Sequence, residues 1–146
     1  MKAVVDSWVQ VTTNLGKIFE LDEDETKAVE EVKSGKKDKV VLDKGFKFVV
    51  VEGKNGIITV SDYYRTVTSI VLDESYILES YRDLLVFLKA NQPCRKKDLE
   101  KVFGFKVDKF VRDAKALGLI KSSNKGYSLT EKGEELIQKL AAEVQG

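Results

Sequence analysis

The stretch that decides the fold of the second half of the chain is Ala116-Leu117-Gly118-Leu119-Ile120, followed by Gly126-Tyr127-Ser128-Leu129-Thr130-Glu131-Lys132-Gly133. A glycine such as Gly118 accepts the positive φ that commonly ends a helix. The polar run 123–126 separates two short predicted strands, 119–122 and 127–130, and predicts a hairpin turn. Thr130 is a favourable N-cap for a following helix. The stretch therefore predicts a helix, a hairpin and a second helix.

Two further helices are predicted before this stretch. An apolar stripe predicts a helix over 75–90, ended by Asn91-Gln92-Pro93; its members are Ile77, Leu78, Tyr81, Leu84, Leu85 and Leu88. A short helix over 96–103 should turn Leu99, Val102 and Phe103 inward, and Gly104 should supply the next turn. The last helix, from Thr130 through Val144, should turn Leu136, Ile137, Leu140 and Val144 inward.

The third helix of the series is predicted over 107–117. Its buried face should consist of Val107, Phe110, Val111, Ala114 and Leu117. At 100° per residue, the opposite face is centred on Lys109, Arg112 and Ala116, with Asp108, Asp113 and Lys115 beside it. This face is basic but not purely so.

The order of these elements, together with the quoted stretch, resembles the winged helix-turn-helix domains of MarR-like and ArsR-like bacterial and archaeal transcription regulators. The resemblance covers about half of the chain. It departs from the family in the short turn at Gly104-Phe105-Lys106, and in Arg95 and Lys106, which stand where Ser, Thr or Asp caps are usual. The resemblance implies that helix 107–117 and the wing 119–130 bind double-stranded DNA.

The charge distribution fits a polyanionic partner. Residues 1–75 carry 11 basic and 14 acidic side chains, whereas residues 76–146 carry 14 and 10. Within 95–125 there are ten basic residues against four acidic ones. A lysine-rich solvated surface is the alternative explanation of this charge. The residues expected to contact DNA are Lys96, Lys97, Lys106, Lys109, Arg112, Lys115, Lys121 and Lys125. Among them Arg112 is the candidate for a base contact, since a guanidinium can donate twice to guanine.

The first half is expected to be a small α+β domain over 1–73, followed by the winged helix over 74–146. Helical spacing of Val4, Trp8, Val11, Leu15, Ile18 and Phe19 favours a helix over 4–19, although β-branched residues there argue for a strand. The acidic run 22–25 predicts the start of a second helix, which should end at Ser34-Gly35. Strands are predicted over 39–43, 46–52, 57–61 and 66–72, with Asn55-Gly56 in a hairpin turn. The fold class is thus α+β: a small antiparallel sheet with one or two helices, then three helices, a wing and a final helix.

The composition argues against the functional classes that depend on histidine or on several cysteines. The chain has no histidine and a single cysteine, Cys94, so neither a metal site, a cofactor nor an enzyme activity is expected. The acidic run 22–25 is better explained as a helix start than as a catalytic cluster. Tyr63 and Tyr64 beside Arg65 could stack on bases, but core or rim aromatics are the better explanation. No apolar run could span a membrane, and no signal peptide is evident, so a cytoplasmic protein is expected. Abundant Lys and Glu suggest a thermophile.

Three functions remain open from the sequence. The first is a sequence-specific transcription regulator, acting as a homodimer joined through the N-terminal half or the last helix. The second is a nucleoid, replication or repair accessory that binds DNA without sequence specificity. The third is a winged helix used for protein–protein contacts. The N-terminal domain would serve in dimerisation or in sensing a ligand.

Overall fold

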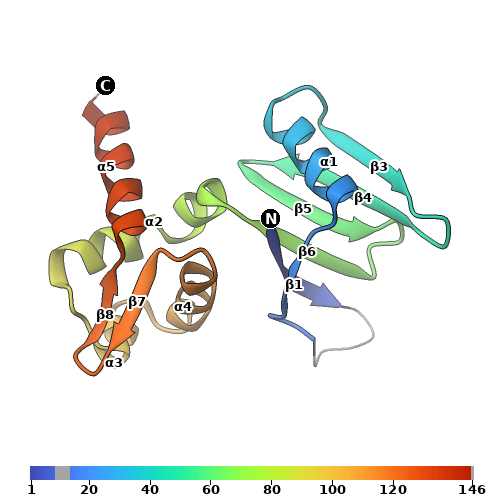
Figure 1. The fold of residues 1–146 in the computed structure, drawn as a ribbon. Coiled ribbons are helices and arrows are strands. Elements are labelled where there is room, and N and C mark those ends of the chain that lie inside the picture. Colours follow the sequence, from blue (N-terminus) through green and yellow to red (C-terminus); the bar gives the residue numbers. More distant parts are fainter. Residues whose placement is uncertain (9–13, 146) are drawn as a thin grey trace. The chain divides into compact units, whose positions relative to one another are not determined.

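The computed structural model describes residues 1–8 and 14–145, with side chains described up to residue 142. The fold is α+β, with five helices and a six-stranded antiparallel sheet within the described residues (Figure 1). Contacts divide the chain into two compact units, Met1–Glu79 and Ser80–Gly146. The sequence had placed the division at 73/74, so the first residues of one helix belong with the first unit. None of the described helices is both long enough and apolar enough to cross a membrane.

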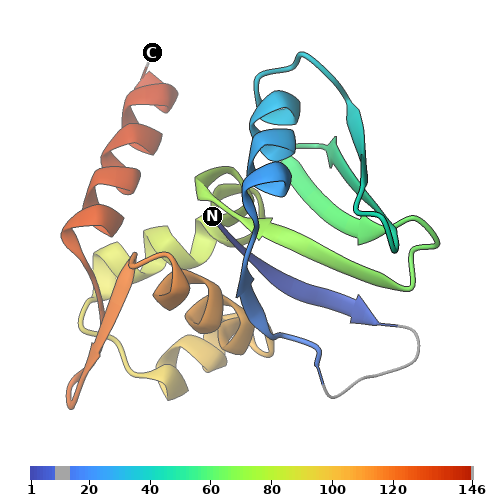
Figure 2. The ribbon, with the colours of Figure 1, turned by 45° about the vertical axis from the view of Figure 1, so that its right-hand side comes forward.

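The first unit is built on the six-stranded sheet, whose strand order is β2-β1-β6-β5-β4-β3. Its strands are β1 (Lys2–Trp8), β2 (Ile18–Glu20), β3 (Lys39–Asp43), β4 (Phe48–Lys54), β5 (Ile57–Asp62) and β6 (Val67–Leu72). Helix α1 (Glu23–Lys33) lies against one face of the sheet (Figure 2). The core between them contains Ala28 and Val29 of the helix with Val51, Val60 and Val71 of the strands.

The helix predicted over 4–19 is wrong, because the described part of this range contains β1, a turn at 14–16 and β2. Strand β1 lies between β2 and β6, and its residues Ala3, Val4 and Val5 are all buried. A strand buried on both faces shows a continuous apolar run instead of alternation, and such a run cannot be told from a helix by periodicity. Residue Val11 of the predicted stripe lies outside the described residues.

The remaining local signals of the first unit are confirmed. Asp22 caps α1 in a capping box: Glu25 N donates to Asp22 Oδ1 at 2.8 Å, and Asp22 N donates to Glu25 Oε1 at 3.0 Å. The helix ends at Ser34, and Gly35 has a φ of 81°. In the β4–β5 hairpin, Asn55 and Gly56 have φ values of 54° and 80°, as a type I′ turn requires.

The second unit contains most of α2 (Glu74–Asn91), then α3 (Lys96–Phe103), α4 (Lys106–Ala116), the hairpin β7 (Ile120–Ser123) and β8 (Gly126–Leu129), and α5 (Glu131–Gln145). The order and bounds of these elements agree with the sequence prediction to within a few residues. Helix α2 is interrupted at Tyr81, whose φ of −135° and ψ of 22° are not helical. The predicted stripe of α2 is confirmed at Leu84, Leu85 and Leu88, which are fully buried. In α5, Leu136 and Leu140 are buried, whereas the side chain of Val144 lies outside the described part of the chain.

The stretch that decided the prediction connects α4, the hairpin and α5. Gly118, with a φ of 71°, and Leu119 donate to Lys115 O at 3.0 Å and Ala114 O at 2.9 Å, which closes α4 in a Schellman motif. Thr130 Oγ1 accepts from Gly133 N at 3.2 Å and so caps α5. A Cβ on Gly133 would lie 2.2 Å from Leu119 O. Each glycine and the threonine therefore has a backbone role.

Candidate nucleic-acid interface

Helices α3 and α4 are joined by a turn of two residues, Gly104 and Phe105. Gly104 has a φ of 64°, and its N–H donates to Glu100 O at 2.8 Å. Neither helix has a side-chain cap at its start, where Arg95 and Phe105 are the N-cap residues. The short turn without side-chain caps and the cap position of Arg95 are as expected, but the cap position of α4 is occupied by Phe105 and not by Lys106.

The inner face of α4 is largely as predicted. Val107, Phe110 and Ala114 are fully buried, while Val111 and Leu117 are partly buried. The ring of Phe110 lies edge-on to that of Tyr81 in α2, with centroids 5.5 Å apart. This packing holds α4 against the unit and leaves its other side toward solvent.

Asp113 is a correction to the sequence prediction, which placed it beside the exposed face of α4. Its exposed fraction is 0%. Its carboxylate accepts from the Tyr81 hydroxyl at 3.0 Å and from Arg112 Nε at 2.8 Å. A buried carboxylate needs such donors, because burying an unpaired charge is unfavourable. The helical wheel could not reveal this, since charged residues are normally assigned to solvent.

Arg112 is consequently less available than the sequence suggested. Its guanidinium turns back onto the neighbouring Asp113, with Nη2 at 3.4 Å from Oδ2, and its side chain is 30% exposed. Asp108, one turn earlier on the same helix, pairs with Lys96.

Lys96 and Lys106, the first residues of α3 and α4, already have partners. Lys96 Nζ lies 2.5 Å from Asp108 Oδ1 and 3.7 Å from Glu100 Oε1. Its hydrogen bond to Asp108 raises the pKa of Lys96 above the usual value. Lys106 Nζ lies 5.8 Å from the centroid of the Tyr81 ring. These contacts join α3 to α4 and α4 to α2.

The hairpin is fixed to the rest of the second unit by backbone and side-chain hydrogen bonds. Cys94 N donates to Tyr127 O at 2.9 Å, and Tyr127 N donates to Cys94 O at 2.8 Å. Gln92 Oε1 accepts from Leu129 N, and Gln92 Nε2 donates to Glu134, both at 2.9 Å. A Cβ on Gly126 would lie 2.6 Å from the Cys94 carbonyl carbon, so the two backbones meet closely.

Three lysines lie on or beside this hairpin, one from α4 and two from the hairpin itself. Lys115 Nζ lies 5.3 Å from the centroid of the Tyr127 ring, which connects the end of α4 to β8. Lys121 is exposed on β7, and Lys125 is exposed in the turn of the hairpin. The turn itself has only two residues between the strands. The hairpin therefore presents charge at a short tip.

Four of the eight predicted site residues are exposed and make neither an ion pair nor a cation–π contact with any residue that the structure describes; they are Lys97, Lys109, Lys121 and Lys125. They come from α3, α4, β7 and the hairpin turn. The other four are engaged: Lys96 with Asp108, Arg112 with Asp113, and Lys106 and Lys115 with tyrosine rings. An unpaired ammonium group can approach a phosphate without first losing a partner.

Sequence reasoning missed an apolar surface at the α3–α4 turn. Phe105 is 98% exposed, and Val102 is 56% exposed, although Val102 was expected to point inward. Leu99 is fully buried and Phe103 partly buried, as expected. The short turn places Phe105 at the N-cap of α4, where no neighbouring element covers it. A turn-length argument could have suggested this exposure.

The first unit carries exposed aromatic residues at one end of its sheet. Phe46, Phe48, Tyr63 and Tyr64 line a hollow of about 270 Å³ together with Gly45, Lys47 and Asp62. The Tyr63 and Tyr64 rings lie edge to face, with centroids 5.5 Å apart. Arg65, expected beside them as a possible base-stacking cation, pairs with Glu52 instead. The tyrosines are therefore rim aromatics of the strand ends.

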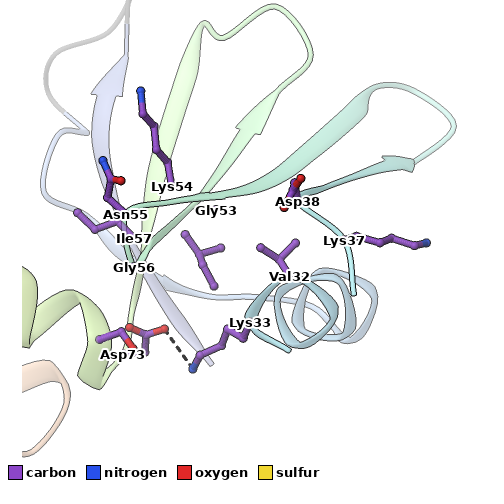
Figure 3. A pocket seen from close by; sticks show the side chains of 12 residues that line it. Val32, Lys33, Lys37, Asp38, Gly53, Lys54, Asn55, Gly56, Ile57 and Asp73 are labelled. Carbon is purple, nitrogen blue, oxygen red and sulfur yellow. Dashed lines mark ion pairs between the residues drawn. The ribbon is translucent and has the colours of Figure 1, made fainter. Parts of the chain in front are cut away.

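A cavity of about 260 Å³ lies between the end of α1 and the β4–β5 turn (Figure 3). Lys33 Nζ lies 3.1 Å from Asp73 Oδ2 at its wall, and Lys37 and Lys54 extend away from it. Asp73 Oδ1 also accepts from Tyr76 N at 2.9 Å. Asp73 thus has both an ion-pair partner and a backbone donor within the first unit. No cluster of metal-ligating side chains is found among the described residues.

No protein-family model matches the chain, and comparisons with curated proteins and with solved structures also found no match.

Proposed function

We propose that the second unit is a winged helix that binds double-stranded DNA through α4 and the β7–β8 hairpin. The observation that carries this proposal is the set of four exposed lysines that have neither an ion-pair nor a cation–π partner among the described residues, Lys97, Lys109, Lys121 and Lys125. They belong to the elements that a winged helix presents to DNA. The order of α2, α3, α4, hairpin and α5 also supports it.

In this proposal α4 lies in the major groove, whose width accepts an α-helix. Lys109 is in the first half of α4, the part of a recognition helix that usually meets base edges. Lys97, Lys121 and Lys125 contact phosphates from α3 and the hairpin. The hairpin tip is too short to follow a groove, so it touches the sugar–phosphate backbone.

Reading of a base by Arg112 would require its guanidinium to exchange Asp113 for guanine. Sequence preference therefore depends on Lys109 and on DNA shape more than on Arg112. A transcription regulator needs such preference, whereas a nucleoid, replication or repair accessory does not. Comparing a preferred genomic site with random duplexes separates the two roles.

The decisive experiment is a gel shift with a random duplex and the triple variant Lys109→Ala/Lys121→Ala/Lys125→Ala. The matched control is Lys17→Ala/Lys27→Ala/Lys36→Ala, which removes the same charge from exposed positions of the first unit. Wild type and control should bind at ~50 mM salt, with log K falling against log salt at a slope of roughly −4 to −5. The site variant should bind at least about tenfold more weakly. Equal binding by the two variants would refute this surface.

Phe105 favours a second candidate function, contact with another protein. Its ring is 98% exposed at the start of α4, next to the exposed Val102. Exposed apolar side chains of this size commonly mark protein interaction sites. Failure of the wild-type chain to bind any duplex at low salt would leave this candidate in first place.

A further inference from the structure

The strand β3 is an open edge of the sheet in the first unit. It is the last strand in the order β2-β1-β6-β5-β4-β3, and Figure 1 shows it as the outermost strand on its side. Its pairing with β4 runs without a register shift over five residues, Lys39 to Asp43. The opposite edge, β2, has only three residues. Natural proteins usually shorten, bend or cover such edges, because unpaired backbone groups invite another strand.

The backbone groups of β3 that face outward can be identified from the ends of the ladder. Gly53 N donates to Asp38 O at 3.2 Å, and Lys44 N donates to Lys47 O at 2.9 Å. In an antiparallel pair, hydrogen-bonded positions alternate along a strand, so the even-numbered residues of β3 bond to β4. The N–H and C=O groups of Lys39, Val41 and Asp43 therefore point away from the sheet.

The sequence of β3, Lys39-Val40-Val41-Leu42-Asp43, is complementary to itself in one arrangement. If two copies pair antiparallel about a twofold axis at Val41, Lys39 of each copy lies opposite Asp43 of the other. All six outward backbone groups of each strand then find partners. A register shifted by two residues separates the charges and leaves Lys39 without an opposite acid. Opposite charges directly across a strand pair are stabilising, and like charges are not.

Apolar side chains flank this edge on both faces of the sheet. Val41 is 48% and Phe48 49% exposed, and these two belong to the face that also carries Lys39 and Asp43. On the other face, Val40 and Leu42 are partly buried against the core beside α1. In the antiparallel arrangement Val40 meets Leu42 of the second copy. Pairing of two β3 strands would thus extend the core beside α1 and cover exposed apolar surface at Val41 and Phe48.

We propose that β3 is a dimer interface, at which two copies of this chain join their sheets into one continuous antiparallel sheet centred on Val41. The occupant is a second copy because the opposite charges at the two ends of β3, Lys39 and Asp43, make the strand complementary to its own reversed sequence. This pairing supplies the homodimer expected of a regulator, but it uses the first unit alone. It is therefore tested without DNA, and its failure would leave the DNA-binding proposal untouched.

The test is sedimentation velocity at about 1–100 μM chain and low salt, with charge-reversal variants of the edge. Wild type should sediment as a dimer. Lys39→Glu places two acids opposite each other at both ends of the pair, and Asp43→Lys does the same with two cations. Each single variant should weaken the dimer at least about tenfold. The double variant Lys39→Glu/Asp43→Lys should restore it.

A mixture of the two single variants provides the sharpest outcome. Glu at position 39 of one chain then lies opposite Lys at position 43 of the other, and the native pair remains at the second end. The mixture should form a heterodimer, although each variant alone is monomeric. Lys17→Glu, an exposed charge reversal near the other edge of the sheet, is the control and should stay dimeric.

A backbone variant tests the same pairing without changing charge. The N–H of Val41 faces outward, so Val41→Pro removes a central dimer hydrogen bond and leaves the ladder to β4 intact. It should be monomeric with an unchanged far-UV circular dichroism spectrum. A monomeric wild type at 100 μM, or single charge variants that remain dimeric, would overturn the proposal. Variants that fail to fold are identified by the spectrum, and the mixing experiment then decides.

Discussion

The hydroxyl of Tyr81 donates a hydrogen bond of 3.0 Å to Oδ2 of Asp113, and both side chains are buried. Tyr81 is the residue at which α2 departs from helical geometry, and Asp113 is the buried acid of α4. The bond therefore joins the interruption of one helix to the helix that we propose to bind DNA. The packing of Tyr81 on Phe110 acts between the same two helices.

Removing either partner should destabilise the second unit by different amounts. Tyr81→Phe deletes one hydrogen bond to a carboxylate that retains Arg112, so a loss of about 1–2 kcal/mol in unfolding free energy is expected. Asp113→Ala leaves both the hydroxyl and the guanidinium without this acceptor, and a loss of roughly 3 kcal/mol is expected. Urea unfolding followed by far-UV circular dichroism measures both. Tyr64→Phe, in an exposed ring, is the control and should change stability by less than about 0.5 kcal/mol.

Gly133→Ala should destabilise the chain although alanine is the better helix former. Gly133 lies inside α5, where replacement of glycine by alanine normally stabilises a helix by about 1 kcal/mol. Here the added Cβ would lie 2.2 Å from Leu119 O, so the backbone of α5 or β7 must move. We expect a net loss of roughly 1–3 kcal/mol in thermal or urea unfolding. Gln138→Ala, at an exposed position of the same helix, should be neutral; a gain in stability for Gly133→Ala would contradict the close approach.

These glycines also explain why the second unit could be predicted well. The bonds by which Gly118 ends α4 and Thr130 caps α5 act within a few residues of their own positions, so local sequence carries the information. The first strand could not be predicted in this way, because β1 pairs with β2 and β6, and β6 comes from far along the chain. The buried state of Asp113 depends on Tyr81, 32 residues away. The apolar periodicity of α4 alone does not reveal that Tyr81 is the partner of Asp113.

The capping box of α1 predicts a pH dependence of stability. The hydrogen bonds from Lys44 and from Glu25 N hold the pKa of Asp22 below its ordinary value. A lowered pKa means that the charged carboxylate stabilises the folded state above the unfolded pKa, and that this contribution is lost as pH falls through the folded pKa. The unfolding free energy should therefore fall with pH below about 4 in the wild type.

Two substitutions separate the cap of Asp22 from its charge. Asp22→Ala removes both and should lower the unfolding free energy by about 1 kcal/mol at pH 7. Asp22→Asn keeps a capping oxygen and should lose less. The difference between wild type and Asp22→Asn should shrink as the pH falls from 5 to about 2, because protonation removes the charge from the wild type too. A difference that stays constant over this range would show that the charge of Asp22 does not stabilise the fold.

Arg112→Ala and Lys121→Ala should affect DNA binding and stability in opposite proportions. Lys121 is exposed and unpaired among the described residues, so its loss should leave the unfolding midpoint unchanged. It should weaken binding to preferred and random duplexes alike and reduce the salt slope by about one.

Arg112 supports the buried Asp113, so its loss should lower stability by roughly 1–3 kcal/mol. If Arg112 also reads a base, binding to a preferred site should fall by a further factor that random DNA does not show. Fluorescence anisotropy should be measured with both duplexes at a temperature well below the unfolding midpoint of Arg112→Ala. The loss of DNA binding is then separated from the loss of stability. Equal losses on both duplexes for Arg112→Ala would assign this arginine to the core of the unit and favour a protein that holds phosphates without reading sequence.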